Sequence, residues 1–283
     1  MNIPWWLKLG AKIVLSRMPL NYKAWQSLGL FRHGRMDQSD YLMRVFTNHM
    51  SRTNMVGQLK GKTILELGPG DSIGTALIGA SHGAKVVLID TGAYATQRID
   101  FYGQLSEKLQ SSGLNPPDLS KACSLDDILK SCKARYFVDG LPSFNSLESA
   151  SVDLIFSQAV LEHVRKKEFV DLLGECRRVL SSSGISSHRV DLKDHLGGNL
   201  NNLRFSEGVW ESDFFIKSGF YTNRIRFTEM IEVFKKSGFQ VDMLNLNYFD
   251  KLPINPKRLH SDFASLPENE LMISGFDVVL RPI

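Results

Sequence analysis

Two glycines and a carboxylate lie close together near the start of the chain. Gly68 and Gly70 directly follow the apolar run Thr63–Leu67, and that run contains Glu66. Glycines let a ligand approach the backbone closely, because they take positive φ angles and have no side chain to clash. A helix expected from about Ile73 would direct free N–H groups at the same turn. Residue types and spacing therefore predict a site for a nucleotide-like ligand.

The spacing also indicates which ligand this is. A dinucleotide turn needs G-x-G-x-x-G, but the third position is Ile73 and Gly74 comes one residue late. No Gly-Lys-Ser/Thr follows to hold a nucleoside triphosphate. Glu66 would repel a phosphate and could pair with a cationic amino group. Asp90 ends the apolar run 85–90, where the second strand of a βαβ unit delivers a carboxylate to ribose hydroxyls.

Histidines and carboxylates at two later strand ends could move a proton. Ligands of open α/β sheets bind at the carboxyl ends of strands, where a general base would have to lie. The candidate bases are His163, His188 and His195. A structural hydrogen bond within its turn would equally explain His163. The set His188, Asp191, Asp194 and His195 also has the ligand types for a divalent metal, but its spacing matches no metal motif, and we predict none.

The elements that must position these residues alternate along the chain. Apolar runs typical of strands cover 63–67, 85–90, 136–138, 152–157, 185–192, 239–249 and 271–280. Helical patterns fall between them, at 73–81, 94–133, 169–180 and 227–237, and the third is followed by an expected turn at 181–184. This alternation predicts the α/β class with a mainly parallel sheet.

Five ordered stretches resemble class I S-adenosylmethionine-dependent methyltransferases of the type 11/23 kind. They are ELGPGDSIG at 66–74, Asp90, DGLP at 139–142, VDLIFSQAVLEHV at 152–164 and RVLSSSG at 178–184. The resemblance covers roughly residues 60–192. Ser72 stands where many members carry a third glycine, and Ser183 replaces the first glycine of a later pair. Neither serine prevents close approach of the backbone.

The resemblance implies a Rossmann-like sheet of seven strands in the order 3-2-1-4-5-7-6, with the last strand antiparallel and helices on both faces. It implies S-adenosyl-L-methionine as the cofactor. Glu66 and the turn 68–70 would hold the methionine moiety, and Asp90 would take the ribose hydroxyls. Asp139 would face the adenine amino group, and Gln158 would lie near the sulfonium.

The acceptor is expected to lie under less readable segments. We predict a helical extension or cap at 1–58, then a catalytic domain at 59–283 whose insertion 193–226 covers the substrate. The insertion is rich in aromatic residues and arginines, which would either pack on the sheet or bind a sugar, lipid-linked or carboxylated acceptor. O-methylation of a small molecule or glycan is the leading hypothesis. The alternatives are an NAD-dependent oxidoreductase and a methyltransferase-like module that binds without catalysing.

Charge and cysteine content limit the partners. The net charge is +4 and the sequence shows no concentrated Lys/Arg stripe, so we expect no nucleic-acid partner. The three cysteines have no metal-type spacing and are odd in number, which favours reduced, buried thiols and a cytoplasmic protein. They are Cys123, Cys132 and Cys176. The sequence sets no oligomeric state.

The N-terminal segment has an amphipathic pattern. Trp5, Leu9 and Ile13 fall at helical spacing, with Lys8 and Lys12 beside the stripe. Charged residues interrupt the run, which argues against a signal peptide, and no run approaches the ~20 apolar residues of a membrane span. A helix that caps the core or forms a dimer contact is the favoured interpretation. The alternative is peripheral contact with the inner face of a membrane.

Overall fold

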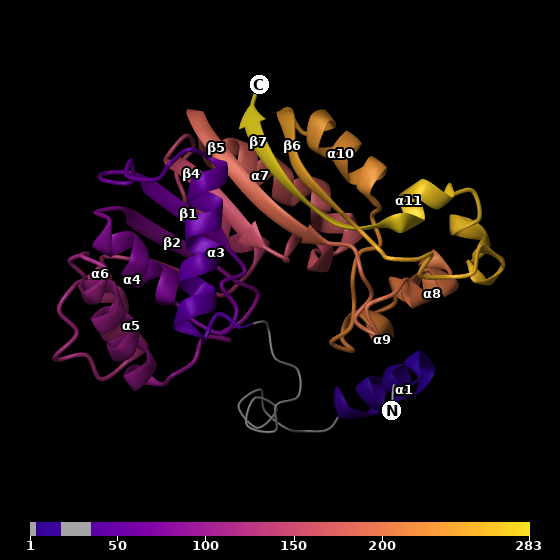
Figure 1. Cartoon of the computed structure of the whole chain (residues 1–283), viewed down its shortest axis with the longest axis horizontal. Helices are drawn as coiled ribbons and strands as arrows, with labels where there is room; N and C mark the ends of the chain where they lie inside the picture. Colours follow the sequence, from indigo (N-terminus) through magenta and orange to yellow (C-terminus); the bar gives the residue numbers. More distant parts are fainter. Residues whose placement is uncertain (1–3, 18–34) are drawn as a thin grey trace.

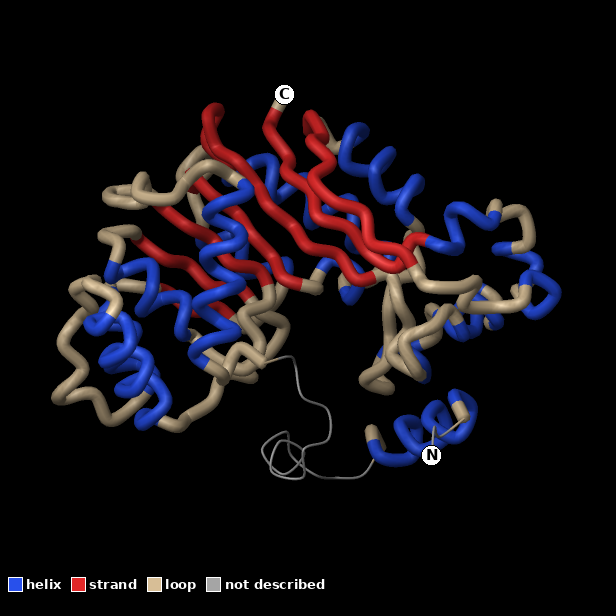
Figure 2. The backbone as a smooth tube through the Cα atoms, in the orientation of Figure 1, coloured by secondary structure: helices blue, strands red, loops and turns tan. Residues whose placement is uncertain are grey.

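The computed structural model describes residues 4–17 and 35–283. Within that part of the chain, seven strands form one sheet in the order β3-β2-β1-β4-β5-β7-β6 (Figures 1 and 2). The strands are β1 (Thr63–Leu67), β2 (Lys85–Ile89), β3 (Arg135–Phe137), β4 (Val152–Gln158), β5 (Leu180–Asp191), β6 (Phe239–Tyr248) and β7 (Ile273–Pro282). β1 to β5 pair in parallel, and β7 runs antiparallel to both β5 and β6. The implied strand order and the antiparallel last strand are confirmed.

Helices cover both faces of this sheet because its strands bury apolar side chains on both. Ile64, Val86 and Leu154 belong to the core on one face, whereas Leu65, Val87 and Ile155 belong to the core on the other. The first face is covered by α3 (Ser39–Arg52), α4 (Gly74–Ser81), α5 (Ile99–Ser111) and α6 (Leu125–Cys132). The second is covered by α7 (Phe169–Val179) and α10 (Phe227–Lys236). Figure 1 shows α3 lying across the face of the sheet.

The late glycine of the turn region has a packing role. Gly74 opens α4 where α3 crosses it, and a Cβ built on Gly74 would lie 2.3 Å from Cδ2 of Leu42 in α3. Leu42 itself is fully buried. Gly74 lies one residue after the position of the third glycine in a dinucleotide turn. Its lack of a side chain instead allows α3 and α4 to pack closely.

The first helix lies apart from the sheet, on the predicted insertion. α1 (Trp5–Leu15) packs the stripe Trp5, Leu9 and Ile13 against a buried cluster formed by Leu196, Trp210, Phe220 and Tyr221. That cluster belongs to 193–226, which contains the short helices η4 (Asn201–Arg204), α8 (Glu207–Trp210) and α9 (Asp213–Ile216). In Figure 1, α1 lies beside α8 and α9. Residues 1–3 and 18–34 of the predicted extension 1–58 lie outside the described part.

Three local expectations are wrong. The turn expected at 181–184 belongs to β5, which pairs Leu180 with Val152 and then shifts register, so that the small polar residues form an irregularity in the strand. The strand expected to begin at Leu271 begins at Ile273 as β7, and Leu271 lies in α11 (Glu268–Met272). Cys123 is exposed, whereas the other two cysteine thiols are buried.

Among the described residues, no helix is both long and apolar enough to cross a bilayer.

Candidate active site

A buried carboxyl group marks the carboxyl end of β1. The side chain of Glu66 is almost inaccessible, with 1% of its surface exposed. Its Oε2 has no hydrogen-bond partner among residues 4–17 and 35–283. Burial raises the pKa of this carboxyl to about 8. A buried carboxyl with an unsatisfied oxygen is costly alone but well suited to pair with an ammonium group.

The glycine turn beside Glu66 has the predicted backbone geometry. Gly68 and Gly70 both lie in the left-handed region, with φ angles of 64° and 63°. A Cβ on Gly68 would come within 2.6 Å of Cγ2 of Val160, because the turn after β4 lies directly against it. The turn therefore leaves no room for a side chain at position 68.

Asp90 ties this turn to the end of β2. Its Oδ2 accepts a hydrogen bond from the backbone N–H of Gly70 at 2.9 Å, and its Oδ1 accepts one from Thr91 at 2.7 Å. Burial raises the pKa of Asp90, and these two hydrogen bonds partly offset that effect. Each carboxylate oxygen keeps a second lone pair, so Asp90 could also accept a hydroxyl hydrogen.

The last two predicted cofactor residues occupy the same edge of the sheet. Asp139 follows β3 and is exposed, and its backbone N–H donates to Oγ of Ser143 at 3.3 Å. Gln158 is the last residue of β4, and its Oε1 lies 3.2 Å from Nε2 of His49.

His49 is a buried polar residue beside Gln158 that no sequence pattern singled out. It is fully buried on α3, and its Nδ1 lies 2.8 Å from Oγ of Ser187 in β5. Because Oε1 of Gln158 can only accept, Nε2 of His49 donates to it and Nδ1 accepts from Ser187. Burial lowers the pKa of His49 to about 3, so the ring stays neutral. His49 follows Leu42 and Val45 at helical spacing, and this pattern could have predicted that its side chain lies on the buried face of the helix.

His188 has the surroundings of a structural histidine. It is 1% exposed, inside β5, and pairs with Ser157 of β4. Its Nδ1 lies 2.7 Å from Oγ of Ser157, and its Nε2 contacts the hydroxyl of Ser186. Burial lowers its pKa to about 3. Both ring nitrogens of His188 are thus hydrogen-bonded to serine hydroxyls within the sheet, which matches a structural role better than that of a base.

The structure brings the other two candidate bases together. The ring centroids of His163, after β4, and His195, after β5, are 4.7 Å apart, and the ring planes meet at 79°. Nδ1 of His163 lies 2.9 Å from the carbonyl oxygen of Tyr221, so Nδ1 carries the proton in the neutral ring. Burial lowers the pKa of His195 to about 3, and the neighbouring His163 and Lys12 lower it further. The pair thus lies between two strand ends, the insertion and α1.

A buried aspartate fixes the loop that carries His195. The carboxylate of Asp194 accepts backbone N–H groups from Leu196, Gly198, Asn199 and Asn201. The carboxylate of Asp194 is thereby committed to the backbone, and His188 to its serine partners. The four residues with the ligand types for a metal are not brought together: no three His, Cys, Asp or Glu side chains of the described residues form a metal-binding group.

The arginines of the insertion support its backbone. The guanidinium of Arg226 donates to the carbonyl oxygens of Leu192, Glu270 and Ile273. Arg224 donates to the carbonyl oxygen of Phe205 at 2.7 Å and pairs with Glu207 at 2.6 Å. Arg204 lies over the ring of Trp5, 5.2 Å from its centroid. These contacts match the packing interpretation of the insertion better than the acceptor-binding one.

A small polar cavity lies beneath the insertion. It has a volume of about 10 Å³, close to what one water molecule needs. Four buried atoms of its lining lack a hydrogen-bond partner within the described chain: Oε2 of Glu162, Oδ1 of Asn202, Nε of Arg224 and Nε of Arg226. Donors and acceptors converge here, so the cavity fits one bridging water. Burial raises the pKa of Glu162 to about 8.

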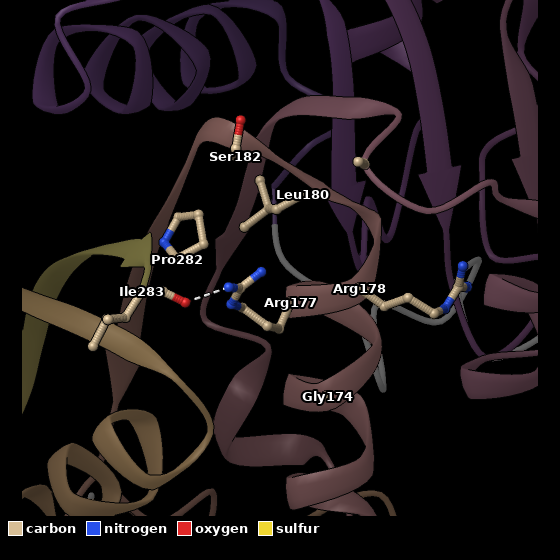
Figure 3. A pocket seen from close by; sticks show the side chains of 8 residues that line it. Gly174, Arg177, Arg178, Leu180, Ser182, Pro282 and Ile283 are labelled. Carbon is tan, nitrogen blue, oxygen red and sulfur yellow. Dashed lines mark hydrogen bonds between the residues drawn. The ribbon is translucent and has the colours of Figure 1, made fainter.

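A second hollow lies at the opposite edge of the sheet. Figure 3 shows it between α7, the start of β5 and the end of β7, with the guanidinium of Arg177 donating to the carbonyl oxygen of Ile283. Leu180 and Ser182 belong to its lining. Ligands of open α/β sheets bind at the carboxyl ends of parallel strands, and this hollow adjoins the amino end of β5. It is therefore not the candidate active site.

Comparison with known proteins gives one family match, and it covers the part of the chain that carries β1 to β5. Residues 65–187 match the family model described as "Methyltransferase domain", which is less than half of the chain. With the strand order β3-β2-β1-β4-β5-β7-β6, this match identifies a class I S-adenosylmethionine-dependent methyltransferase domain. S-adenosyl-L-methionine is the cofactor expected of such a domain. No curated protein matches the chain.

Several solved structures have a similar fold at low sequence identity. A methyltransferase from Archaeoglobus fulgidus, described as SAM-dependent, is 12% identical, with coverage of 84% of this chain and 92% of that one and a TM-score of 0.45. The 1,6-didemethyltoxoflavin-N1-methyltransferase from Burkholderia thailandensis is 11% identical, with coverage of 88% of each chain and a TM-score of 0.43. The CurJ carbon methyltransferase is 17% identical, with a TM-score of 0.41, and the match covers 80% of this chain but only 49% of that one. At such scores these structures identify neither the acceptor nor the acceptor atom.

Proposed function

We propose that this methyltransferase transfers the methyl group to a hydroxyl group of a small molecule or glycan. The observation that carries this proposal is the pair of imidazoles, His163 and His195, between the ends of β4 and β5. A hydroxyl acceptor must lose its proton as the new bond forms, and a positioned imidazole is the usual proton acceptor for that step.

The residues at the ends of β1 to β4 would hold the cofactor, which supplies an electrophilic methyl group when bound. Glu66 would pair with the ammonium of the methionine moiety, because its buried Oε2 needs a donor. The turn 68–70 would lie against the same moiety. Asp90 would accept the ribose hydroxyls, and Asp139 would face the adenine amino group. Gln158, held by His49, would lie near the sulfonium.

Of the two imidazoles, His163 is the better oriented base. Its Nδ1–H donates to the carbonyl oxygen of Tyr221, so Nε2 is the basic, unprotonated nitrogen of the neutral ring. His195 packs against its ring and stays neutral, because burial strongly disfavours its charged form. We propose that His195 and the loop fixed by Asp194 orient the acceptor, while His163 takes its proton.

The insertion 193–226 and α1 would form the cover of this site. The carbonyl oxygen of Tyr221, in the insertion, accepts a hydrogen bond from His163. The positive charge of Lys12, in α1, lowers the pKa of His195. An acceptor that reaches the histidine pair would therefore pass beside both segments. We propose that the acceptor is selected there, because none of the predicted cofactor residues belongs to the insertion or to α1.

A labelled-methyl assay tests the proposal. The protein, with radiolabelled S-adenosylmethionine, is incubated with fractions of a cell extract, and the labelled product is tested for a methyl ether by its stability to alkali. Absence of any affinity for S-adenosylmethionine or S-adenosylhomocysteine would contradict the function as a whole. Cofactor binding without any labelled product would favour a non-catalytic module. Tight binding of a nicotinamide dinucleotide would favour an oxidoreductase.

A further inference from the structure

Helix α1 is unusually apolar for a helix at the protein surface. Eight of its eleven residues are apolar, yet none of its side chains is fully buried. An ordinary surface helix has one apolar stripe and an opposite polar face. α1 therefore has apolar surface left over after it has packed on the insertion.

The two apolar faces of α1 are distinct. Trp5, Leu9 and Ile13 pack against the insertion cluster. Trp6, Leu7 and Val14 point elsewhere, with 57%, 47% and 63% of their surface exposed. At 100° per residue, these three and the exposed Gly10 and Ala11 fall within an arc of about 140°. We call these five residues the outer face, and it contains no charged side chain.

An exposed aromatic side chain next to α1 enlarges this apolar surface. Phe214, in α9, is 51% exposed. The guanidinium of Arg17 lies 3.8 Å from the centroid of its ring and donates a hydrogen bond to its carbonyl oxygen at 2.9 Å. Phe214 is thereby joined to the end of α1, and Arg17 places a positive charge beside it.

The charge of the surrounding chain indicates what this surface meets. No Asp or Glu occurs before Asp37, whereas the first 36 residues contain six cations: Lys8, Lys12, Arg17, Lys23, Arg32 and Arg35. Lys8 and Lys12 lie on the side of α1 between its two apolar faces. A second copy of the chain would bring like charges together, which is unfavourable. A surface with anionic lipid headgroups has the complementary charge, and exposed tryptophan suits its interfacial region.

We propose that the outer face of α1, together with Phe214, docks on a membrane surface that contains anionic lipids. The helix axis would lie in the plane of the bilayer, with Trp6, Leu7 and Val14 among the headgroups and upper acyl chains. Lys8 and Arg17 would face the phosphates. Because the opposite face of α1 covers the insertion, docking would bring the cover of the candidate active site against the bilayer. The docking surface itself does not depend on methyl transfer.

Sedimentation with vesicles tests this proposal on the full chain. Vesicles of phosphatidylcholine alone are compared with vesicles that contain phosphatidylglycerol as three lipids in ten. We expect at least tenfold tighter binding to the anionic vesicles, and weaker binding as salt is added. The double variant Trp6→Ser/Val14→Ser should bind at least tenfold more weakly. The matched control Val56→Ser/Val170→Ser removes two valines that are 61% and 58% exposed elsewhere, and should bind within twofold of the natural chain.

Fluorescence quenching separates lipid contact from loss of the helix. Lipids with brominated acyl chains should quench the tryptophan emission of the natural protein. Trp6→Phe should still sediment with anionic vesicles but lose a large part of the quenching. Each of three results would overturn the proposal: equal or no binding to the two vesicle types, unchanged binding of Trp6→Ser/Val14→Ser, or a solution dimer that this variant dissociates while neither protein binds vesicles.

Discussion

The imidazole of His163 meets that of His195 edge to face, with ring centroids 4.7 Å apart. The two residues come from turns after different strands, so only the folded sheet brings them together. Their environments differ: a backbone carbonyl fixes the proton of His163, whereas burial and neighbouring positive charge keep His195 neutral. This pair is where we expect the proton of the acceptor to be handled.

The first prediction concerns catalysis by this pair. His163→Asn should lower kcat by roughly 10²-fold or more, because a general base contributes about 10²–10⁴-fold. Its dissociation constant for S-adenosylmethionine should stay within twofold, since His163 is not one of the predicted cofactor residues. His260→Asn is the control, because Asn can replace the bond that His260 accepts from the N–H of Asp262. An unchanged kcat for His163→Asn would contradict the role of His163.

Cofactor binding should release a proton from Glu66. The pKa of this buried carboxyl is about 8 in the free protein, and pairing with an ammonium group favours its ionised form. Binding at pH 7 should therefore release about one proton, and affinity should rise with pH up to about 8. Calorimetry in two buffers of different ionisation enthalpy measures this number. Glu66→Gln should weaken binding and abolish the release; proton release that persists in this variant would exclude Glu66 as the source.

The buried carboxyl of Glu162 should make stability depend on pH. Its folded pKa, raised to about 8, lies above the value of 4.5 for an exposed carboxyl, so its contribution is fully present below pH 4.5. That contribution is lost as the pH rises to about 8, at up to about 1.4 kcal/mol per pH unit. Urea unfolding should show Glu162→Gln gaining stability relative to the natural chain between pH 5 and pH 8. The half-buried Glu175→Gln serves as control, and equal slopes for all three proteins would argue against a protonated Glu162.

A side chain at position 68 should block cofactor binding. Gly68→Ala places a Cβ 2.6 Å from Cγ2 of Val160, on a residue whose φ of 64° already disfavours alanine. We expect at least tenfold weaker binding of S-adenosylmethionine. Adding Val160→Ala relieves the contact but not the backbone strain, so it should restore binding in part. The affinities of the two single variants and the double variant for S-adenosylmethionine measure the coupling energy between positions 68 and 160. Full affinity of Gly68→Ala would show that the turn tolerates a side chain.

The sequence predicted the sheet well because its signals are local. The apolar strands, the glycine turn and the acids at strand ends each depend on neighbours in the chain, and family resemblance added the strand order. The role of His49 depends on a partner 109 residues away, Gln158, and no local pattern shows that. The arginines of the insertion were ambiguous for a related reason, because backbone carbonyls, which every residue has, are their partners.

The contacts of α3 constrain the order in which this protein can fold during synthesis. The helix is made before every strand of the sheet, yet His49 bonds with Ser187 of β5 and Arg52 pairs with Asp277 of β7 at 2.8 Å. Its apolar stripe must therefore wait, exposed or held by a chaperone, until most of the chain has left the ribosome. A fragment that begins at residue 59 would lack α3, so apolar side chains on one face of its sheet would be exposed to solvent. We expect this fragment to aggregate.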